Sequence, residues 1–137
     1  MSLKDAHTAL TTAVTTALGT TPVQRENAGP FTKPVNAKWA ALYYLPNVPT
    51  VSTLSDAGQD MADGIIQIDF HYPDGDGDDA ADSDVETFRA AFKAGQKFTH
   101  SGQSAVIQSC GRSPGRLEDN WFIVSVTISW YALISRA

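Results

Sequence analysis

The sequence contains a single cysteine, no long apolar run, and no basic-then-apolar leader at its N-terminus. One cysteine cannot form an internal disulfide, and a membrane-spanning helix needs about 20 predominantly apolar residues in a row. These absences predict a protein that is made and kept in an aqueous, cytosolic compartment. The formal charge of −5 also argues against coating DNA, or binding an anionic membrane, by bulk charge.

Length and composition favour one folded domain. The chain has 137 residues, of which 42% are apolar and 18% are charged. A chain of this size can bury a core without disulfide or metal support, and its composition is that of a globular protein. We therefore expect residues 1–137 to form a single domain.

Basic residues are missing from one long segment. From Asp56 to Glu86 there are 11 acidic residues and no Lys or Arg, which leaves 10 bases and 4 acids in the remaining chain. Such a separation of charge suits self-assembly through complementary surfaces. The alternative is that the acidic run forms a solvated loop and helix start.

Apolar residues at helical spacing predict a first helix over residues 2–18. Ser2 can act as the N-cap, Asp5 lies in the first turn, and Gly19 follows the last apolar residue. Five threonines within the segment weaken an isolated helix, because β-branched side chains lose rotamer freedom there. We therefore expect the helix to be held by packing of its apolar stripe on a sheet.

A second helix is predicted over residues 79–94. Ser83 and Glu86 have the spacing of a capping box, and Gly95 follows as a stop signal. Acidic residues in the first turn match the positive end of the helix dipole. The expected core stripe consists of Val85, Phe88, Ala91 and Phe92.

Alternating apolar and polar residues predict a β-sheet. The expected strands are residues 23–26, 38–45, 65–72, 97–100, 105–110 and 121–130. Residues 97–110 are interpreted as a hairpin, and residues 111–120 as a turn into the last strand. Residues 46–63 form a polar stretch longer than most loops, which is either a functional arm or a hairpin.

The order of these elements predicts an α+β fold. Helix, strands, helix and strands follow one another without an internal repeat, which favours an antiparallel or mixed β-sheet with two α-helices packed on one face. In this arrangement, Leu10, Val14, Phe88 and Phe92 pack on alternate sheet residues. Those sheet residues are Ile66, Ile68, Phe70, Val124, Val126 and Ile128.

The acidic turn at residues 74–78 has the sequence DGDGD, which starts like an EF-hand calcium loop. Counted from Asp74, however, the sixth position is Asp79 instead of glycine, and the twelfth is Val85 instead of an acid. A strand also precedes the run where a helix is required. The segment is therefore interpreted as an acidic strand-to-helix turn, and no metal site is predicted.

No catalytic arrangement is predicted either. Ser104 lies in the sequence GQSAV, in which Val106 replaces the second glycine of a nucleophile elbow. No local sequence supports pairing of Cys110 with His71 or His100. The histidines lack zinc-site spacing, and no phosphate-binding loop is present. We therefore predict no enzymatic activity, no metal and no cofactor.

Several segments, taken in order, resemble one known family. They are LKDAHTALTTAVTTAL, QRENAGPF, WAALYYLP, GIIQIDFHYPDGDG, AFKAGQ and WFIVSVTISWY. The most specific is the alternating strand from Gly64 to Pro73, followed by Gly75 and Gly77. In order and spacing, these segments resemble the tail terminator (tail completion) proteins of long-tailed bacteriophages.

The resemblance implies a small α+β subunit that closes into a hexameric ring on the end of the tail tube. Such a ring stops tube polymerisation and joins the tail tube protein to the connector or stopper protein of the head, while DNA only passes through its lumen. The implied location is the tail–head junction of the virion, after synthesis in the host cytoplasm and without a membrane. The alternative is a small soluble ligand-binding or hydrolytic α+β domain, which needs a pocket with converging polar groups.

Ring assembly is expected to use the 46–63 segment and the acidic turn, because of their length and charge. Their acids either meet bases of the neighbouring subunit, such as Lys33 or Lys38, or face the lumen, where they repel DNA phosphates. The acidic run is denser than the resemblance implies. The candidate interface residues are Asp56, Asp60, Asp74, Asp76, Asp78, Arg112 and Arg116.

Overall fold

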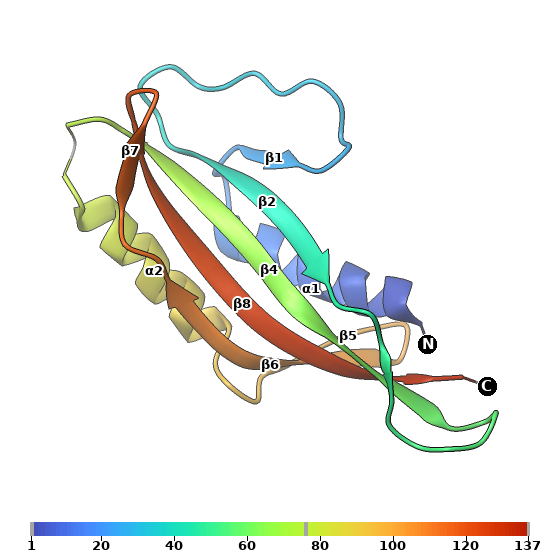
Figure 1. Cartoon of the computed structure of the whole chain (residues 1–137). Helices are drawn as coiled ribbons and strands as arrows, with labels where there is room; N and C mark the ends of the chain where they lie inside the picture. Colours follow the sequence, from blue (N-terminus) through green and yellow to red (C-terminus); the bar gives the residue numbers. More distant parts are fainter. Residues whose placement is uncertain (1, 76, 137) are drawn as a thin grey trace.

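A computed structural model describes residues 2–75 and 77–136 of the chain (Figure 1). Within these residues there are two helices and eight strands. In chain order they are α1 (Leu3–Leu18), β1 (Val23–Arg25), β2 (Trp39–Pro46), β3 (Thr50–Val51), β4 (Gln59–Pro73), α2 (Asp79–Ala91), β5 (Lys97–His100), β6 (Gln103–Arg112), β7 (Arg116–Glu118) and β8 (Trp121–Ser135).

The strands form one mixed sheet in the order β1-β2-β4-β8-β6-β5, in which β3 also pairs with β4 and β7 with β8. β1 and β2 are parallel, and the other pairs are antiparallel. β4 and β8 are each 15 residues long and pair over their whole length, from Gln59↔Ser135 to Pro73↔Trp121. The predicted α+β class is confirmed.

Both helices pack on the same face of this sheet, as predicted (Figure 1). Alternate residues of β4 and β8 point to the helices, because side chains along a strand alternate between its two faces. We call this the helix face, and the opposite one the second face. The helix residues Leu10, Val14, Phe88 and Phe92 share one buried cluster with Ile66, Ile68, Phe70, Val124, Val126 and Ile128.

The boundaries of α1 follow the local signals in the sequence. The Ser2 hydroxyl accepts a hydrogen bond from the backbone N–H of Asp5 at 3.1 Å, which satisfies one of the free N–H groups of the first turn. Gly19 has φ +62° and donates its N–H to the carbonyls of Thr15 and Thr16. The predicted cap and stop are therefore both confirmed.

α2 begins at Asp79, the predicted residue, but not through the predicted capping box. Asp78 precedes the helix and makes no side-chain capping bond, while Asp79 and Asp82 lie in the first turn. Ser83 and Glu86 are inside the helix, so the predicted capping box is wrong. The acids of the first turn instead favour the start of the helix through its dipole.

α2 also ends three residues before the predicted position. Phe92 leaves the helical conformation, with φ −119° and ψ 57°, although its N–H still bonds to the carbonyl of Phe88 at 2.8 Å. Gly95, predicted to stop the helix, has φ +88° and belongs to the next turn, where its N–H bonds to the carbonyl of Ile107. That contact ties the end of the helix to β6.

The polar segment 46–63 is a hairpin, and we call it the arm. β3 pairs with the first residues of β4, with Thr50 opposite Met61, and the C-terminal part of β8 runs along the other side of β4. β4 therefore begins at Gln59, six residues before the predicted strand. The reason is that the buried positions here are the small residues Ala62 and Gly64, so the usual alternation of large apolar and polar residues is missing. Figure 1 shows the arm extending from one end of the sheet.

The second half of the sheet contains two tight hairpins. Ser101 and Gly102 connect β5 to β6 with φ of 50° and 81°, which confirms the predicted hairpin. The segment 111–120, predicted as a turn, contains β7, which pairs with β8 across Asp119 and Asn120, with φ of 50° and 65°. Paired positive φ values are typical of two-residue hairpin turns.

Phe92→Ala is expected to lower the free energy of unfolding by about 3–5 kcal/mol, because it removes buried apolar surface and leaves a cavity. Phe92 is 1% exposed, and its ring lies 5.6 Å from that of Phe88 and 5.3 Å from that of Phe98 between centroids. Urea unfolding measures the change. Val35→Ala is the control, since Val35 is 87% exposed. A loss below about 1 kcal/mol in Phe92→Ala contradicts this core assignment.

Candidate functional site

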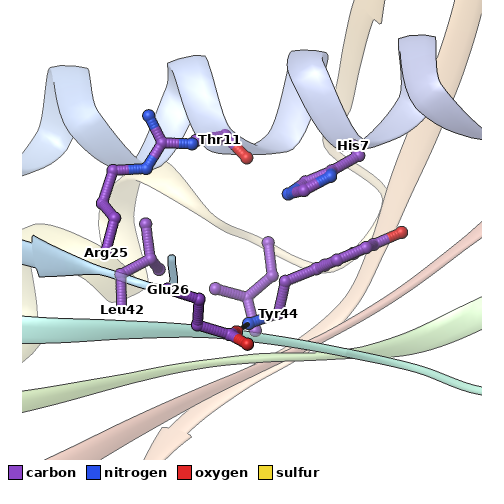
Figure 2. Close-up of a pocket in the computed structure, with 7 residues that line it drawn as sticks. His7, Thr11, Arg25, Glu26, Leu42 and Tyr44 are labelled. Carbon is purple, nitrogen blue, oxygen red and sulfur yellow. Dashed lines mark hydrogen bonds between the residues drawn. The ribbon is translucent and has the colours of Figure 1, made fainter. Parts of the chain in front are cut away.

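A small pocket opens between α1 and the strands β1 and β2 (Figure 2). The imidazole of His7 lies flat on the ring of Tyr44, with a centroid distance of 3.8 Å and an interplanar angle of 9°. The cavity measures about 150 Å³, below the roughly 300–1,000 Å³ of ordinary ligand pockets. Its lining residues are His7, Thr11, Arg25, Glu26, Leu42, Tyr44 and Ile66.

The polar groups of this pocket do not converge on one point. Figure 2 shows Arg25 and the Tyr44 hydroxyl at opposite ends of the lining. A Glu26 carboxylate oxygen accepts a hydrogen bond from the backbone N–H of Tyr44 at 2.6 Å, so this acid holds the strand edge. Burial, assisted by Arg25, lowers the pKa of His7, while burial raises that of Tyr44. The arrangement offers no pair of acid and base that could act on a substrate.

The side chains considered for nucleophilic catalysis lie apart. Cys110 packs against the core on the helix face, and burial raises the pKa of its thiol. His71 lies on the second face, stacked on Trp39 at 3.7 Å between centroids. His100 lies 3.9 Å from a carboxylate oxygen of Asp5. Each group therefore has its own neighbours, and no thiol–imidazole pair forms.

Neither a metal cluster nor a spanning helix is found in the described part of the chain. Within residues 2–75 and 77–136, no three His, Cys, Asp or Glu side chains lie close enough together to hold an ion. The structure includes Asp74 and Asp78 of the acidic turn, whereas Asp76 lies outside the described residues. Neither α1 nor α2 has the length and apolar character needed to cross a membrane.

A carboxylate lies in the middle of the second face. Asp69 accepts hydrogen bonds from the hydroxyl of Ser125 at 2.6 Å and the amide of Gln67 at 2.9 Å. The guanidinium of Arg116 lies 3.9 Å from Asp69 and 2.6 Å from the carboxylate of Glu118. Arg116, a predicted interface residue, therefore pairs with acids of its own chain.

The other predicted interface residues lie at two ends of the β4–β8 pair. Asp56 and Asp60 belong to the arm, and Asp74 and Asp78 follow the opposite end of β4. A strand of 15 residues spans about 50 Å, so the two acidic groups are separate surfaces. Arg112, at the end of β6, lies with the second group.

The bases beside the acidic turn are also paired within the chain. An Arg112 guanidinium nitrogen lies 2.9 Å from Asp82, and the Lys38 ammonium donates to Asp84 at 3.2 Å. Asp84 also accepts a hydrogen bond from the Tyr72 hydroxyl at 2.7 Å, and burial together with this acid raises the pKa of Tyr72. These contacts fasten α2 to the sheet and neutralise part of the acidic run.

The arm carries apolar side chains that nothing in the described chain covers. Val48 is 86% exposed, Leu54 is 88% exposed and Val51 is 63% exposed. The sequence did not indicate that these residues form an exposed apolar group, because each stands alone among polar residues and prolines. We call the exposed apolar side chains of the arm and of the neighbouring parts of β2 and β8 the arm surface: Leu45, Val48, Val51, Leu54 and Leu133. The register places Leu45 and Leu133 on the second face and Val51 on the helix face.

The tip of the arm, residues 52–58, is organised by Arg136 at the other end of the chain. The backbone N–H of Arg136 donates a hydrogen bond to the carbonyl of Gly58 at 3.0 Å. A guanidinium has five N–H donors in a rigid plane, so one side chain can hold several loop carbonyls in place. The guanidinium of Arg136 donates hydrogen bonds to the carbonyl oxygens of Thr53, Ser55 and Gln59 and to a carboxylate oxygen of Asp60.

Comparison with known proteins assigns the chain to a family and to a fold. A family model described as phage tail terminator protein matches residues 5–130. Nine chains of solved structures match, and one of them has a TM-score of 0.77 and 20% sequence identity, over 97% of this chain and 96% of that chain. At this identity, the likeness shows the fold alone. None of the curated protein sequences matches.

Acidification is expected to destabilise the protein, and His71→Phe is expected to reduce this effect. Burial lowers the pKa of His71 below the ordinary value of 6.5. Between the unfolded and the lower folded pKa, the unfolded chain binds more protons, so stability falls as the pH falls through this window. Phenylalanine keeps the ring stack on Trp39 but cannot take up a proton.

Urea unfolding at about pH 7.5 and pH 5.5 measures this difference for the wild type and for His71→Phe. Loss of the contact between His71 Nδ1 and the Asp69 carbonyl lowers stability equally at both pH values, so only the pH-dependent part reports the proton. An unchanged pH dependence in the variant contradicts the prediction.

Proposed function

The chain belongs to the phage tail terminator family, and we propose that it forms a ring that caps the end of the tail tube. The family is structural, and membership makes the protein a component of the phage tail. In the proposal, the ring is a hexamer that ends tube polymerisation and presents its opposite side to the connector or stopper protein of the head. It is made in the host cytoplasm and lies at the tail–head junction, where DNA passes through its lumen.

The observation that carries this proposal is the family match over residues 5–130, which spans both helices and most of the sheet. The arm surface supports it, because several exposed large apolar side chains at one end of a sheet are typical of a protein contact. The pocket at His7 and Tyr44 is small, and the Glu26 carboxylate in its lining is engaged by the backbone of its own chain. We therefore infer a structural role without enzymatic activity or a cofactor.

The acidic turn is proposed to face the lumen of this ring. In a ring, one surface of a subunit meets a different surface of its neighbour, so the acids of Asp74, Asp76 and Asp78 do not face themselves. Nearby bases that could meet them from a neighbour, Lys38 and Arg112, already pair with carboxylates of their own chain. An acidic lumen repels DNA phosphates and lets the DNA slide without binding.

Tails assembled without this protein are expected to exceed their normal length, because nothing ends the growth of the tube. Addition of the purified protein to growing tubes restores a uniform length, which electron microscopy measures. Light scattering is expected to give about 88 kDa for the ring, or six chains of 14.7 kDa. Tails of normal length in the absence of the protein contradict the capping function, and a different mass contradicts the hexamer.

Reversal of charge in the acidic turn is expected to slow DNA passage and leave the ring intact. The variant combines Asp74→Lys and Asp78→Lys, and Glu86→Lys on the exposed side of α2 is the control. Added lysines attract phosphates, so DNA ejection from particles slows while the mass of the ring stays the same. Loss of the ring assigns the turn to a subunit contact, and no change in either property leaves it as a solvated helix start; both results contradict the lumen placement.

A further inference from the structure

We propose that the arm inserts side chains at and beside its tip into an apolar groove on a second copy of this chain. The groove lies between α1, the C-terminal end of α2 and β5, and the inserting residues are Val51 and Leu54. The contact joins neighbouring subunits of the ring, so this inference rests on the proposed function. It identifies the two surfaces that meet.

The groove exists because one side of α1 carries small residues. Ala13 and Ala17 leave space between the helix and the ring of Phe98, and Ala91 and Phe92 close the end near α2. The cavity measures about 390 Å³, within the range of roughly 300–1,000 Å³ in which proteins bind apolar groups. It is larger than the pocket at His7 and, unlike that pocket, has no Arg or Glu in its lining, and it therefore suits an aliphatic side chain.

The arm offers aliphatic side chains on a loop that is already ordered. Leu54 and Val51 are exposed, and Arg136 holds the loop that carries Leu54. The backbone N–H of Gln59 also donates to the hydroxyl of Thr53 at 2.7 Å, across the base of the tip. A loop fixed before binding loses less conformational entropy when it docks, so its few apolar contacts yield more affinity.

The two surfaces have opposite charge. Residues 46–63 contain three aspartates and no base, and Asp56 has no ion-pair partner among the described residues. Residues 87–100, which supply Ala91, Phe92 and Phe98 to the groove, contain three Lys or Arg and no acid. Lys93 and Lys97, each next in sequence to a groove phenylalanine, make none of the ion pairs found among the described residues. The charges favour an arm on a groove and disfavour an arm on an arm.

Addition of a strand from a neighbour is the competing way to join two sheets, and the edges near the arm oppose it. Along the outer edge of β2, the backbone N–H of Tyr44 already donates to the Glu26 carboxylate, and Pro46 has no N–H to donate. Beside the C-terminal part of β8, the amide of Gln103 donates to the carbonyl of Leu133 at 3.0 Å. Edges blocked in this way do not template a new strand. Contact through side chains is therefore favoured.

An arm cannot reach the groove of its own chain, because β4 and β8 hold it in the sheet and direct it away from the helices (Figure 1). Each chain thus carries one arm and one groove that must both find a neighbour. Contacts between unlike surfaces close into a ring when the rotation between subunits is right. This is the geometry that the proposed function requires.

Two single variants test the contact. Leu54→Asp places a charge on the arm, and Thr16→Trp fills the groove from an exposed position on α1. In each variant, the dissociation constant of self-assembly is expected to rise at least about tenfold, since an apolar anchor is lost or excluded. Val35→Asp is the matched control, because Val35 is equally exposed but belongs to neither surface, and it is expected to assemble like the wild type.

A mixture of the two variants makes the test specific. Leu54→Asp keeps an intact groove and Thr16→Trp keeps an intact arm, so together they form one junction and no second one. Analytical ultracentrifugation is therefore expected to show a heterodimer and nothing larger. Circular dichroism confirms that each variant is folded, and Val51→Asp or Thr12→Trp replaces one that is not.

The remaining outcomes contradict the contact between arm and groove. They also distinguish failure of this contact from failure of the proposed ring. Rings of wild-type mass formed by both variants show that the subunits meet elsewhere, while the ring itself stands. Monomeric variants that form no heterodimer show that the arm and this groove do not share a junction. Intact rings of Leu54→Asp that no longer limit tail length assign the arm to the tube protein. A wild type that limits tail length as a monomer excludes both the ring and this contact.

Discussion

The continuous pairing of β4 with β8 is the constraint on which the rest of the molecule depends. Each strand contributes 15 residues, and the alternation along both places the same set of aliphatic and aromatic side chains toward the helices. A slip of one residue would turn Ile66, Ile68 and Phe70 to the opposite face and remove the surface on which α1 and α2 pack. The helices, the half-buried carboxylate of Asp69 on the second face and the arm all take their positions from this register.

The length of that pair also explains why the arm is exposed. A 15-residue strand is about 50 Å long, whereas the 16 residues of α1 cover only about 24 Å. The two central strands therefore continue beyond the part of the sheet that the helices cover. Side chains there cannot be buried within the subunit, which is why Val48, Val51 and Leu54 stay in contact with solvent. Arg136, at the end of β8, lies beside them because its strand runs along β4.

The charge separation of the sequence takes a different form in space. Folding brings Arg112 to Asp82, Lys38 to Asp84, Arg116 to Asp69 and Arg136 to Asp60, so four bases from distant positions pair with acids of the 56–86 run. Exposed pairs of this kind add little to stability, but they set which charges remain for a partner. What is left is an acidic arm, an acidic turn at the opposite end of the sheet, and unpaired lysines near the groove. These features favour contact between unlike surfaces of a ring.

Local signals determined α1, from the Ser2 cap to Gly19, and the alternating strands, because each depends on residues close in sequence. The same patterns were enough to place Phe88 and Phe92 in the core and to indicate the family. The end of α2, the early beginning of β4, the strand β7 and the contact of Arg136 with the arm were decided by tertiary structure. Arg136 and Asp60 are 76 residues apart, and only the closed sheet brings them together. The groove likewise arises where α1, α2 and β5 meet, so no single segment of the sequence contains it.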